Sequence, residues 1–466
     1  MANWDNTIWH DITKVNNGNE YTSRDSISSS DLNKIVENIL YLKENMGTSG
    51  GGGTVQLYPP NATLSGTSLT ISNSSSNGNF TDGYKVYVND SLKQTINSSS
   101  STTVNIGSYV SDSGEYIVKV TCFGEGFLES DPISLTYEKT RSISWTSGTP
   151  PQNSVDDGAG ASTSSYAIFS GGRSTYAQDV SYKFTAYNAN KQKTDLTATS
   201  AFGVVAASVG DNAIFLGGTN GWDMMSAFNK TIINNNLTSV SAVSMPNLDQ
   251  YSCSAQTDEY AYFMGGIYES NENMAQNNIY RISSDLTVES LYLLSPISKG
   301  AATQCYYFGG TNKIAIAGGY KAEGILNDTI QIMRDSEPRP TETFVNITPR
   351  YDLSAGRVDE YTFFAGGRTS SSKTDLVEIY NSNFTETQAN LSNARSRIGV
   401  ATVNDEYIVF AGGEGQNAVD IWDKNLTKID SSSYKLVSIP TYSAAATSLG
   451  NMAFFVADGT NIFELT

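Results

Sequence analysis

Hydrophobic residues in the C-terminal two-thirds of the chain recur as short runs that end in paired glycines. The runs end at residues 172, 218, 266, 319, 367 and 413, and the first glycine of each pair follows the previous one after 46, 48, 53, 48 and 46 residues. A degenerate seventh copy spans residues 452–458, with Ala457 in place of the first glycine. A period near 50 residues with one such strand per unit predicts a repeat architecture.

The residues around each glycine pair predict three further strands per unit. A strand of small residues precedes the pair, as in 398–403, and a strand such as 419–422 follows it. Turns rich in Asn and Asp, as at Asn425, then open a fourth strand. Glycine is expected where strand backbones crowd together and turn.

This pattern resembles the Kelch family over residues 141–466, which implies a mainly β chain with a seven-bladed Kelch-like β-propeller. The last copy lacks the glycine pair, and the tryptophan of the fourth strands is incompletely matched. The seventh unit holds three strands at most, so residues 142–146 are predicted to supply its fourth strand. That pairing would close the ring and remove exposed sheet edges.

Residues 55–138 alternate between β-strands such as 84–88 and 116–120 and clusters of turn residues. The sequence from Asp112 to Tyr116 resembles the corner before strand F of immunoglobulin-like domains, and residues 124–131 resemble a hairpin of bacterial fibronectin-III-like spacers. We therefore predict an Ig/fibronectin-III-like β-sandwich. A spacer role is favoured over a binding role.

A short N-terminal helix is predicted over residues 30–46, with Ser30 as the N-cap, and residues 47–54 form a Gly-rich linker. The hydrophobic positions of this helix follow a heptad pattern; they are Leu32, Ile35, Ile39, Leu42 and Met46. Two heptads fit either one helix packed on its own protein or an oligomeric coiled coil. A homotrimer is the expected assembly.

Composition and charge narrow the function. The 466 residues carry a net charge of −18, which repels phosphate backbones and anionic membranes, so neither nucleic acid nor membrane is an expected partner. The chain lacks an apolar run long enough for a membrane span and begins without a secretion signal. Its three cysteines are far apart, and we predict buried free thiols.

The sequence holds one histidine, His10, outside both predicted folded modules. This excludes Ser-His-Asp and Cys-His catalysis in the C-terminal repeats, as well as histidine-based metal sites there. We predict no catalytic residues, no metal and no cofactor. A carboxylate pair for glycoside cleavage stays open, because an acidic chain contains many candidate pairs.

Residues 4–9, 15–20 and 33–42 resemble the start of tail-fibre or receptor-binding proteins of phages and phage-tail-like bacteriocins that attack Gram-positive bacteria. The resemblance implies a virion or tail-particle location, with residues 1–46 attached to the baseplate or tail proteins. It also implies a head that binds a host cell-surface glycan or surface-layer protein. A bacterial adhesin or Kelch interaction scaffold is the alternative, and a glycan-cleaving propeller enzyme is the second.

The binding surface is predicted on the loops that follow the glycine pairs. In Kelch-like propellers these loops and the loops between blades emerge on one face. Aromatic faces stack on sugar rings, and a few polar groups fix the orientation. The predicted stacking residues are Trp222, Tyr268, Tyr320 and Tyr176, with Arg173, Lys321 and Arg368 as polar partners.

Changing Trp222 and Tyr268 together to Ala is expected to abolish host-cell binding, because it removes two stacking surfaces. The melting temperature is expected to change little, since both residues are predicted at exposed loop tips. A cell-adsorption assay and a thermal melt on the same preparation check this. Full adsorption by the double variant, or loss only with unfolding, contradicts the predicted face.

Overall fold

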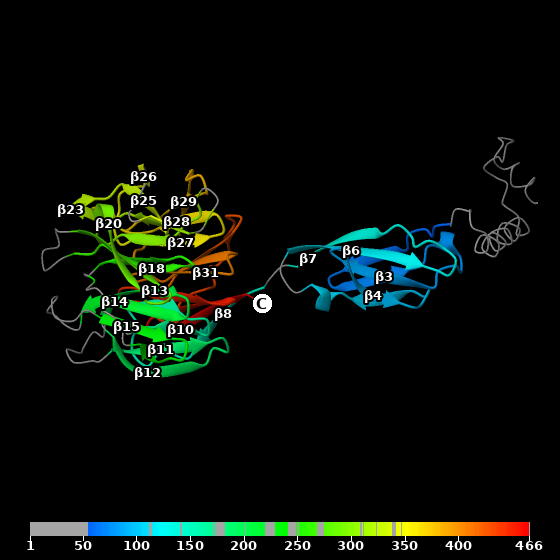
Figure 1. Cartoon of the computed structure of the whole chain (residues 1–466), viewed down its shortest axis with the longest axis horizontal. Coiled ribbons are helices and arrows are strands. Elements are labelled where there is room, and N and C mark those ends of the chain that lie inside the picture. The colour runs from blue at the N-terminus through cyan, green and yellow to red at the C-terminus, as the bar shows by residue number, and fades with distance from the viewer. Residues whose placement is uncertain are drawn as a thin grey trace, which may run out of the picture. The chain divides into compact units, whose positions relative to one another are not determined.

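The computed structural model describes residues 55–110, 114–139, 142–170, 172, 182–200, 202–219, 229–240, 248, 251–267, 275–307, 310, 312–322, 324–337, 342–345 and 347–465. The chain is mainly β and divides into two compact units, Met1–Arg141 and Ser142–Thr466 (Figure 1). The predicted helix at 30–46, its five heptad residues and the linker at 47–54 lie outside the described residues. Within the described ranges, no helix is long and apolar enough to cross a membrane.

The first unit contains two antiparallel sheets around one hydrophobic core. One sheet has the order β1-β2-β5, with β1 Asn61–Ser65, β2 Ser68–Ser72 and β5 Thr102–Asn105. The other has the order β4-β3-β6-β7, with β3 Gly83–Val88, β4 Ser91–Ile96, β6 Gly114–Phe123 and β7 Ile133–Lys139. Alternate residues of β2, β3 and β6 are buried in the shared core, as the two-residue period of a half-buried strand requires. Two 3-10 turns, η1 Ser75–Asn77 and η2 Gly107–Tyr109, complete the unit.

In its described residues, the second unit contains seven four-stranded antiparallel sheets; five are built from consecutive strands, the fourth skips a two-stranded hairpin, and the last takes its fourth strand from the start of the unit. The first sheet contains β9 Gly160–Ser162, β10 Tyr166–Phe169, β11 Tyr182–Asn188 and β12 Lys193–Ser200, and the second contains β13 Phe202–Val209, β14 Asn212–Thr219, β15 Asn229–Asn234 and β16 Ser239–Val240. The third contains β17 Cys253–Gln256, β18 Tyr260–Met264, β19 Gln276–Ser283 and β20 Val288–Ile297. The fourth contains β21 Ala301–Gln304, β22 Lys313–Ala317, β25 Thr329–Arg334 and β26 Glu342–Val345. A hairpin of β23 Tyr320–Ala322 and β24 Ile325–Leu326 extends from the fourth sheet's second strand.

The last three sheets follow the same order. The fifth sheet contains β27 Ser354–Val358, β28 Tyr361–Ala365, β29 Leu376–Tyr380 and β30 Glu386–Asn390. The sixth contains β31 Gly399–Val403, β32 Tyr407–Ala411, β33 Val419–Asp423 and β34 Lys428–Ile429. The seventh contains β35 Ala445–Leu449, β36 Met452–Val456 and β37 Thr460–Leu465, with β8 Ile143–Gly148 as its fourth strand. β8 pairs antiparallel with β37 from Ile143↔Leu465 to Gly148↔Thr460, which confirms the pairing predicted for residues 142–146.

The first strands of the seven sheets contact one another in sequence order. Each of β9, β13, β17, β21, β27 and β31 contacts the first strand of the next sheet, and β35 contacts β9. Residues of all seven strands line one cavity of about 320 Å³, here called the central cavity. Gly, Ala, Ser and Thr dominate this lining, because only small side chains fit where seven strands converge.

Buried apolar side chains of the second strands fill the space between neighbouring sheets. Ile408 and Phe410 of β32 pack with Phe363 and with Trp422.

The paired glycines lie at the ends of the second strands, where other backbone atoms come very close. At Gly366 the backbone has a φ of +60°, and a Cβ would lie 2.4 Å from the Arg395 carbonyl oxygen, so only glycine fits without displacement.

A polar side chain in the third strand holds the chain segment that arrives from the previous sheet. In each case a side-chain oxygen accepts a hydrogen bond from a backbone N–H: Thr185 from Gln152, Gln331 from Leu294, Glu378 from Thr348, Asp420 from Ser392 and Asn461 from Val437. The same contact between the third strand and the incoming segment thus recurs in five of the seven sheets.

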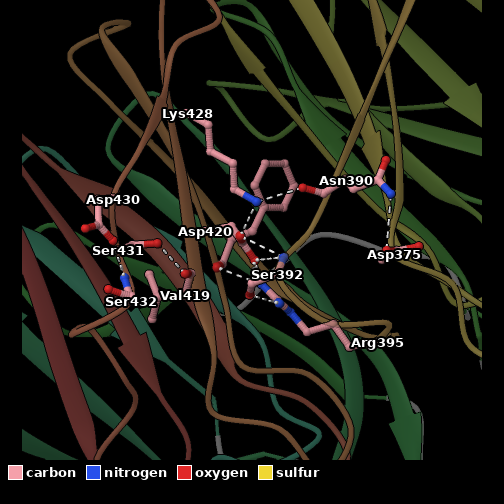
Figure 2. A network of polar contacts seen from close by, with 11 residues as sticks. Asp375, Asn390, Ser392, Arg395, Val419, Asp420, Lys428, Asp430, Ser431 and Ser432 are labelled. Atoms are coloured by element: carbon pink, nitrogen blue, oxygen red, sulfur yellow. Dashed lines mark hydrogen bonds and ion pairs between the residues drawn. The ribbon is translucent and has the colours of Figure 1, made fainter.

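Two of these third-strand residues are buried carboxylates with buried arginine partners. Glu378 pairs with Arg350, and Asp420 pairs with Arg395 at 2.7 Å; all four side chains are 0–1% exposed. Lys428 also contacts Asp420, at 2.8 Å (Figure 2). Burial would raise the pKa of Asp420, but Arg395 and Lys428 outweigh it, so the pKa is lowered and the carboxylate stays ionised.

All three cysteines, Cys122, Cys253 and Cys305, are buried free thiols, as predicted. Burial raises the pKa of Cys253 to about 12, which keeps this thiol protonated at neutral pH.

Deleting residues 142–146 removes most of β8 and leaves the outer edge of β37 without a partner. It also removes Trp145, whose ring stacks on Tyr434 at 5.9 Å. We expect the melting temperature to fall by about 10 °C or more, or the protein to aggregate through the open edge. Thermal melts and light scattering measure both effects, with deletion of residues 49–53 in the glycine-rich linker as the control. Equal melting temperatures for the two deletions would contradict closure by β8.

Candidate functional site

The backbone takes the same left-handed conformation at or just before the start of six of the seven first strands. The residues at this turn, each with positive φ, are Asp157, Gly203, Tyr251, Lys299, Asp352 and Arg397. Glycine adopts this conformation without strain, whereas other residues do so at a cost of about 1 kcal/mol or more. Five of the six positions nevertheless carry a large or charged side chain.

Hydrogen bonds link these turns from sheet to sheet. The backbone N–H of Gly203 donates to the Asp157 carbonyl oxygen at 2.9 Å, and the N–H of Asp352 donates to the Lys299 carbonyl oxygen at 2.8 Å. The Lys299 and Arg397 N–H groups make equivalent bonds to the preceding turn. These bonds link the Asp157 turn to the Gly203 turn and join the turns from Tyr251 to Arg397 in one series, through backbone groups alone.

The turn residues line a second cavity of about 380 Å³, here called the mouth cavity. Its lining residues stand one to four positions before the first central-cavity residue of the same sheet. The mouth cavity thus lies where the first strands begin. The second strands run antiparallel to the first and end there in the glycine pairs, so this is the end of the unit from which the loops after those pairs extend.

Charges of both signs meet at the mouth cavity. Arg397 Nε lies 3.1 Å from the Asp352 carboxylate, whose side chain is 8% exposed. Burial would lower the pKa of Arg397, but Asp352 and then Asp157 outweigh it, so the pKa is raised and the guanidinium stays charged. The Lys299 ammonium lies 4.5 Å from the centroid of the Tyr251 ring, a cation–π contact.

The end of the segment before the seventh sheet is fixed by one carboxylate. Asp156, 3% exposed, accepts hydrogen bonds from the backbone N–H groups of Thr441, Tyr442 and Ser443 at 2.7 to 2.9 Å. Tyr442 and Ser443 thereby take their place in the lining of the mouth cavity. Asp156 joins the seventh sheet to the first at this end of the unit.

Three of the predicted binding residues lie in described segments. Tyr320 is half-buried, and its ring packs on Tyr351, next to Asp352, with centroids 4.9 Å apart. Lys321 forms an ion pair with Asp328 at 3.1 Å. Trp222, Tyr268, Arg173 and Tyr176 lie outside the described residues.

The Arg368 side chain lies between Asp352, which lines the mouth cavity, and Glu414, which follows β32 of the sixth sheet. It forms an ion pair with Glu414, and its Nε lies 4.0 Å from the Asp352 carboxylate. Ser396 also donates to Glu414, at 3.1 Å. Burial would raise the pKa of Glu414, but Arg368 and Ser396 outweigh it and lower that pKa. The Arg368 guanidinium is thus held against the mouth, and 29% of the side chain is exposed.

The turn residues Asp157, Tyr251, Lys299, Asp352 and Arg397 were not predicted from the sequence. A regular spacing in the sequence could have identified these positions, because four of the five residues precede the first glycine of their repeat's pair by 14 or 15 residues. Lys299 breaks the spacing, since the hairpin between β21 and β22 is longer. The sequence alone does not reveal the positive φ at these positions, which raises the conformational free energy of residues other than glycine.

The mouth can bind a polar ligand by hydrogen bonds and by contact with tyrosine rings. Across the described residues, no group of three or more His, Cys, Asp or Glu side chains is arranged to hold a metal ion. No protein-family model matches this sequence, and a search of curated proteins finds no similar chain.

Proposed function

We propose that this chain is the receptor-binding protein, or tail fibre, of a phage or phage-tail-like bacteriocin that targets Gram-positive bacteria, and that it binds without catalysis. Residues 141–466 form the head, a seven-bladed Kelch-like β-propeller. Residues 55–138 form an Ig/fibronectin-III-like spacer. Residues 30–46 form a helix that assembles a homotrimer, and residues 1–46 attach to the baseplate.

The contacts between sheets support the propeller. Seven four-stranded antiparallel sheets, first strands that contact one another in a closed cycle, and one cavity lined by all seven are what a seven-bladed propeller requires. The pairing of β8 with β37 supports closure of the ring by strands from both ends of the unit.

The mouth cavity supports recognition of a polar ligand, which we propose is a host cell-surface glycan or a surface-layer protein. The observation that carries this proposal is the set of five large or charged side chains held at positions where glycine would be unstrained. Backbone strain retained at a cavity favours a functional role over a structural one. Charges of both signs and tyrosine rings suit a ligand with hydroxyl, amide or mixed charged groups.

Residues 141–466 alone are expected to bind host cells, and residues 1–140 are expected not to. Fluorescently labelled fragments, incubated with candidate host bacteria and counted by flow cytometry, measure this. Melting curves for both fragments establish that each is folded. Binding of the N-terminal fragment at the level of the full chain would make the head assignment wrong.

Arg397→Gln is expected to weaken host-cell binding by about tenfold, because it removes a charged donor held at the mouth. The matched control is Arg357→Gln in β27, since Arg357 also pairs with an aspartate, Asp405, at 3.1 Å but lies toward the other end of its strand. Adsorption constants of the two variants, compared with wild type, check the prediction. Equal loss in both variants, or loss in Arg357→Gln alone, argues against the mouth as the binding site.

A further inference from the structure

A third cavity, of about 530 Å³, lies at the outer edge of the sixth sheet. It exists because the fourth strand of that sheet is short. β34 pairs with β33 only at Lys428 and Ile429, and the chain then departs and returns to pair Lys435 with Ala418. In the neighbouring fifth sheet the fourth strand runs for five residues.

The departing loop is ordered by its own hydrogen bonds. Ser432 N–H donates to the Asp430 carboxylate at 3.0 Å, and Tyr434 N–H donates to the Ser431 carbonyl oxygen at 2.8 Å. The Ser431 hydroxyl donates to the Val419 carbonyl oxygen at 2.6 Å, in place of a neighbouring strand (Figure 2). The edge of β33 is therefore satisfied while the space beside it stays open.

The floor of the cavity is charged, but its charges are already paired. Asp420 is bound by Arg395, Lys428 and both the backbone N–H and hydroxyl of Ser392, and Figure 2 shows it between these groups. Lys428 also donates to the Asn390 carbonyl oxygen at 2.7 Å. A ligand therefore meets a polar floor that requires no counter-charge from it, and the two other charged groups of the lining, Lys435 and Asp430, are of opposite sign.

The rim offers hydrogen-bonding groups of both kinds. Two donors, the amide nitrogen of Gln416 and the ammonium of Lys435, have no hydrogen-bond partner in the described part of the chain. Two acceptors, the amide oxygens of Asn393 and Asn417, likewise have no partner among the described residues. Sugar hydroxyls both donate and accept, so they match such a mixed set.

An aromatic ring completes the lining. Tyr434 lines the cavity, and its ring stacks on Trp145 with an interplanar angle of 17°. Trp145 is held in turn by its indole N–H, which donates to the Lys435 carbonyl oxygen at 3.0 Å. A ring fixed in this way can contact the apolar face of a sugar without losing much side-chain freedom.

We propose that this cavity is a binding site for an uncharged saccharide unit, separate from the mouth cavity. Its volume falls in the range of about 300–1,000 Å³ typical of small-molecule sites. The inference extends the proposed function, on which it depends only for the cell-surface source of the sugar. Two sites on one head would let it hold a polymer at two points, which strengthens attachment without new contacts at the mouth.

The test is saturation-transfer difference NMR on the full-length protein with the methyl glycosides of glucose, galactose and N-acetylglucosamine. At least one is expected to bind with a dissociation constant of about 1 mM. Glucuronic acid is the charged comparison and is expected to bind no more tightly. Absence of binding by all three glycosides, or tighter binding of glucuronic acid, overturns the proposal.

Two variants locate the site. Gln416→Ala combined with Asn417→Ala removes rim amides, and Ser432→Trp fills the cavity; each is expected to weaken sugar binding by about tenfold or more. The control is Gln388→Ala, an exposed glutamine on β30 outside the cavity. Unchanged affinity in both cavity variants overturns the proposal, as does an equal loss in the control.

Cell adsorption separates this inference from the proposed function. A head that adsorbs to bacteria but shows no cavity-dependent sugar binding leaves the proposed function standing without the second site. Cavity-dependent sugar binding without adsorption to any candidate host has the opposite meaning: the site exists, and the proposed receptor-binding role is wrong.

Discussion

The joining of the two ends of the second unit is the constraint on which its other features depend. β8 enters from the N-terminal side and completes the sheet that the chain finishes with β37. Asp156, only a few residues after β8, binds the three N–H groups that lead into the same sheet. These contacts span 285 or more residues of sequence, so they close a loop that contains all the sheets between them.

With the ends joined, side-chain size and polarity vary with distance from the central cavity. Small residues line that cavity, large apolar residues such as Phe363 and Phe410 fill the spaces between sheets, and polar residues of the third strands hold the incoming segments. Glu378 and Asp420 make this last contact as buried ions, which requires Arg350 and Arg395 as partners. Removing one member of such a pair leaves a buried charge and costs about 3–5 kcal/mol.

The repeat, the mainly β class and the use of residues 142–146 as a returning strand could be predicted from the sequence, because they depend on local patterns and spacing. The glycine pairs could be predicted as close-contact positions for the same reason, as Gly366 illustrates. The mouth was missed, since a positive φ at Asp352 or Arg397 leaves no mark in composition or periodicity. The cavity of the sixth sheet was missed because it results from a strand that stops early at Ile429, and strand ends are poorly encoded by local sequence.

The left-handed turns have a consequence for how the lining of the mouth cavity can vary. Backbone hydrogen bonds between sheets hold these turns, and residues other than glycine are strained there, Asp less than most. At Tyr251 and Lys299, which contact each other through a cation–π interaction, exchanging one large side chain for another changes the lining of the mouth at little cost to folding. Asp352 and Arg397 depend on each other as an ion pair and are less free to change. Point substitutions at a few codons therefore suffice to change the lining of the mouth cavity, with no need for insertions or a new scaffold.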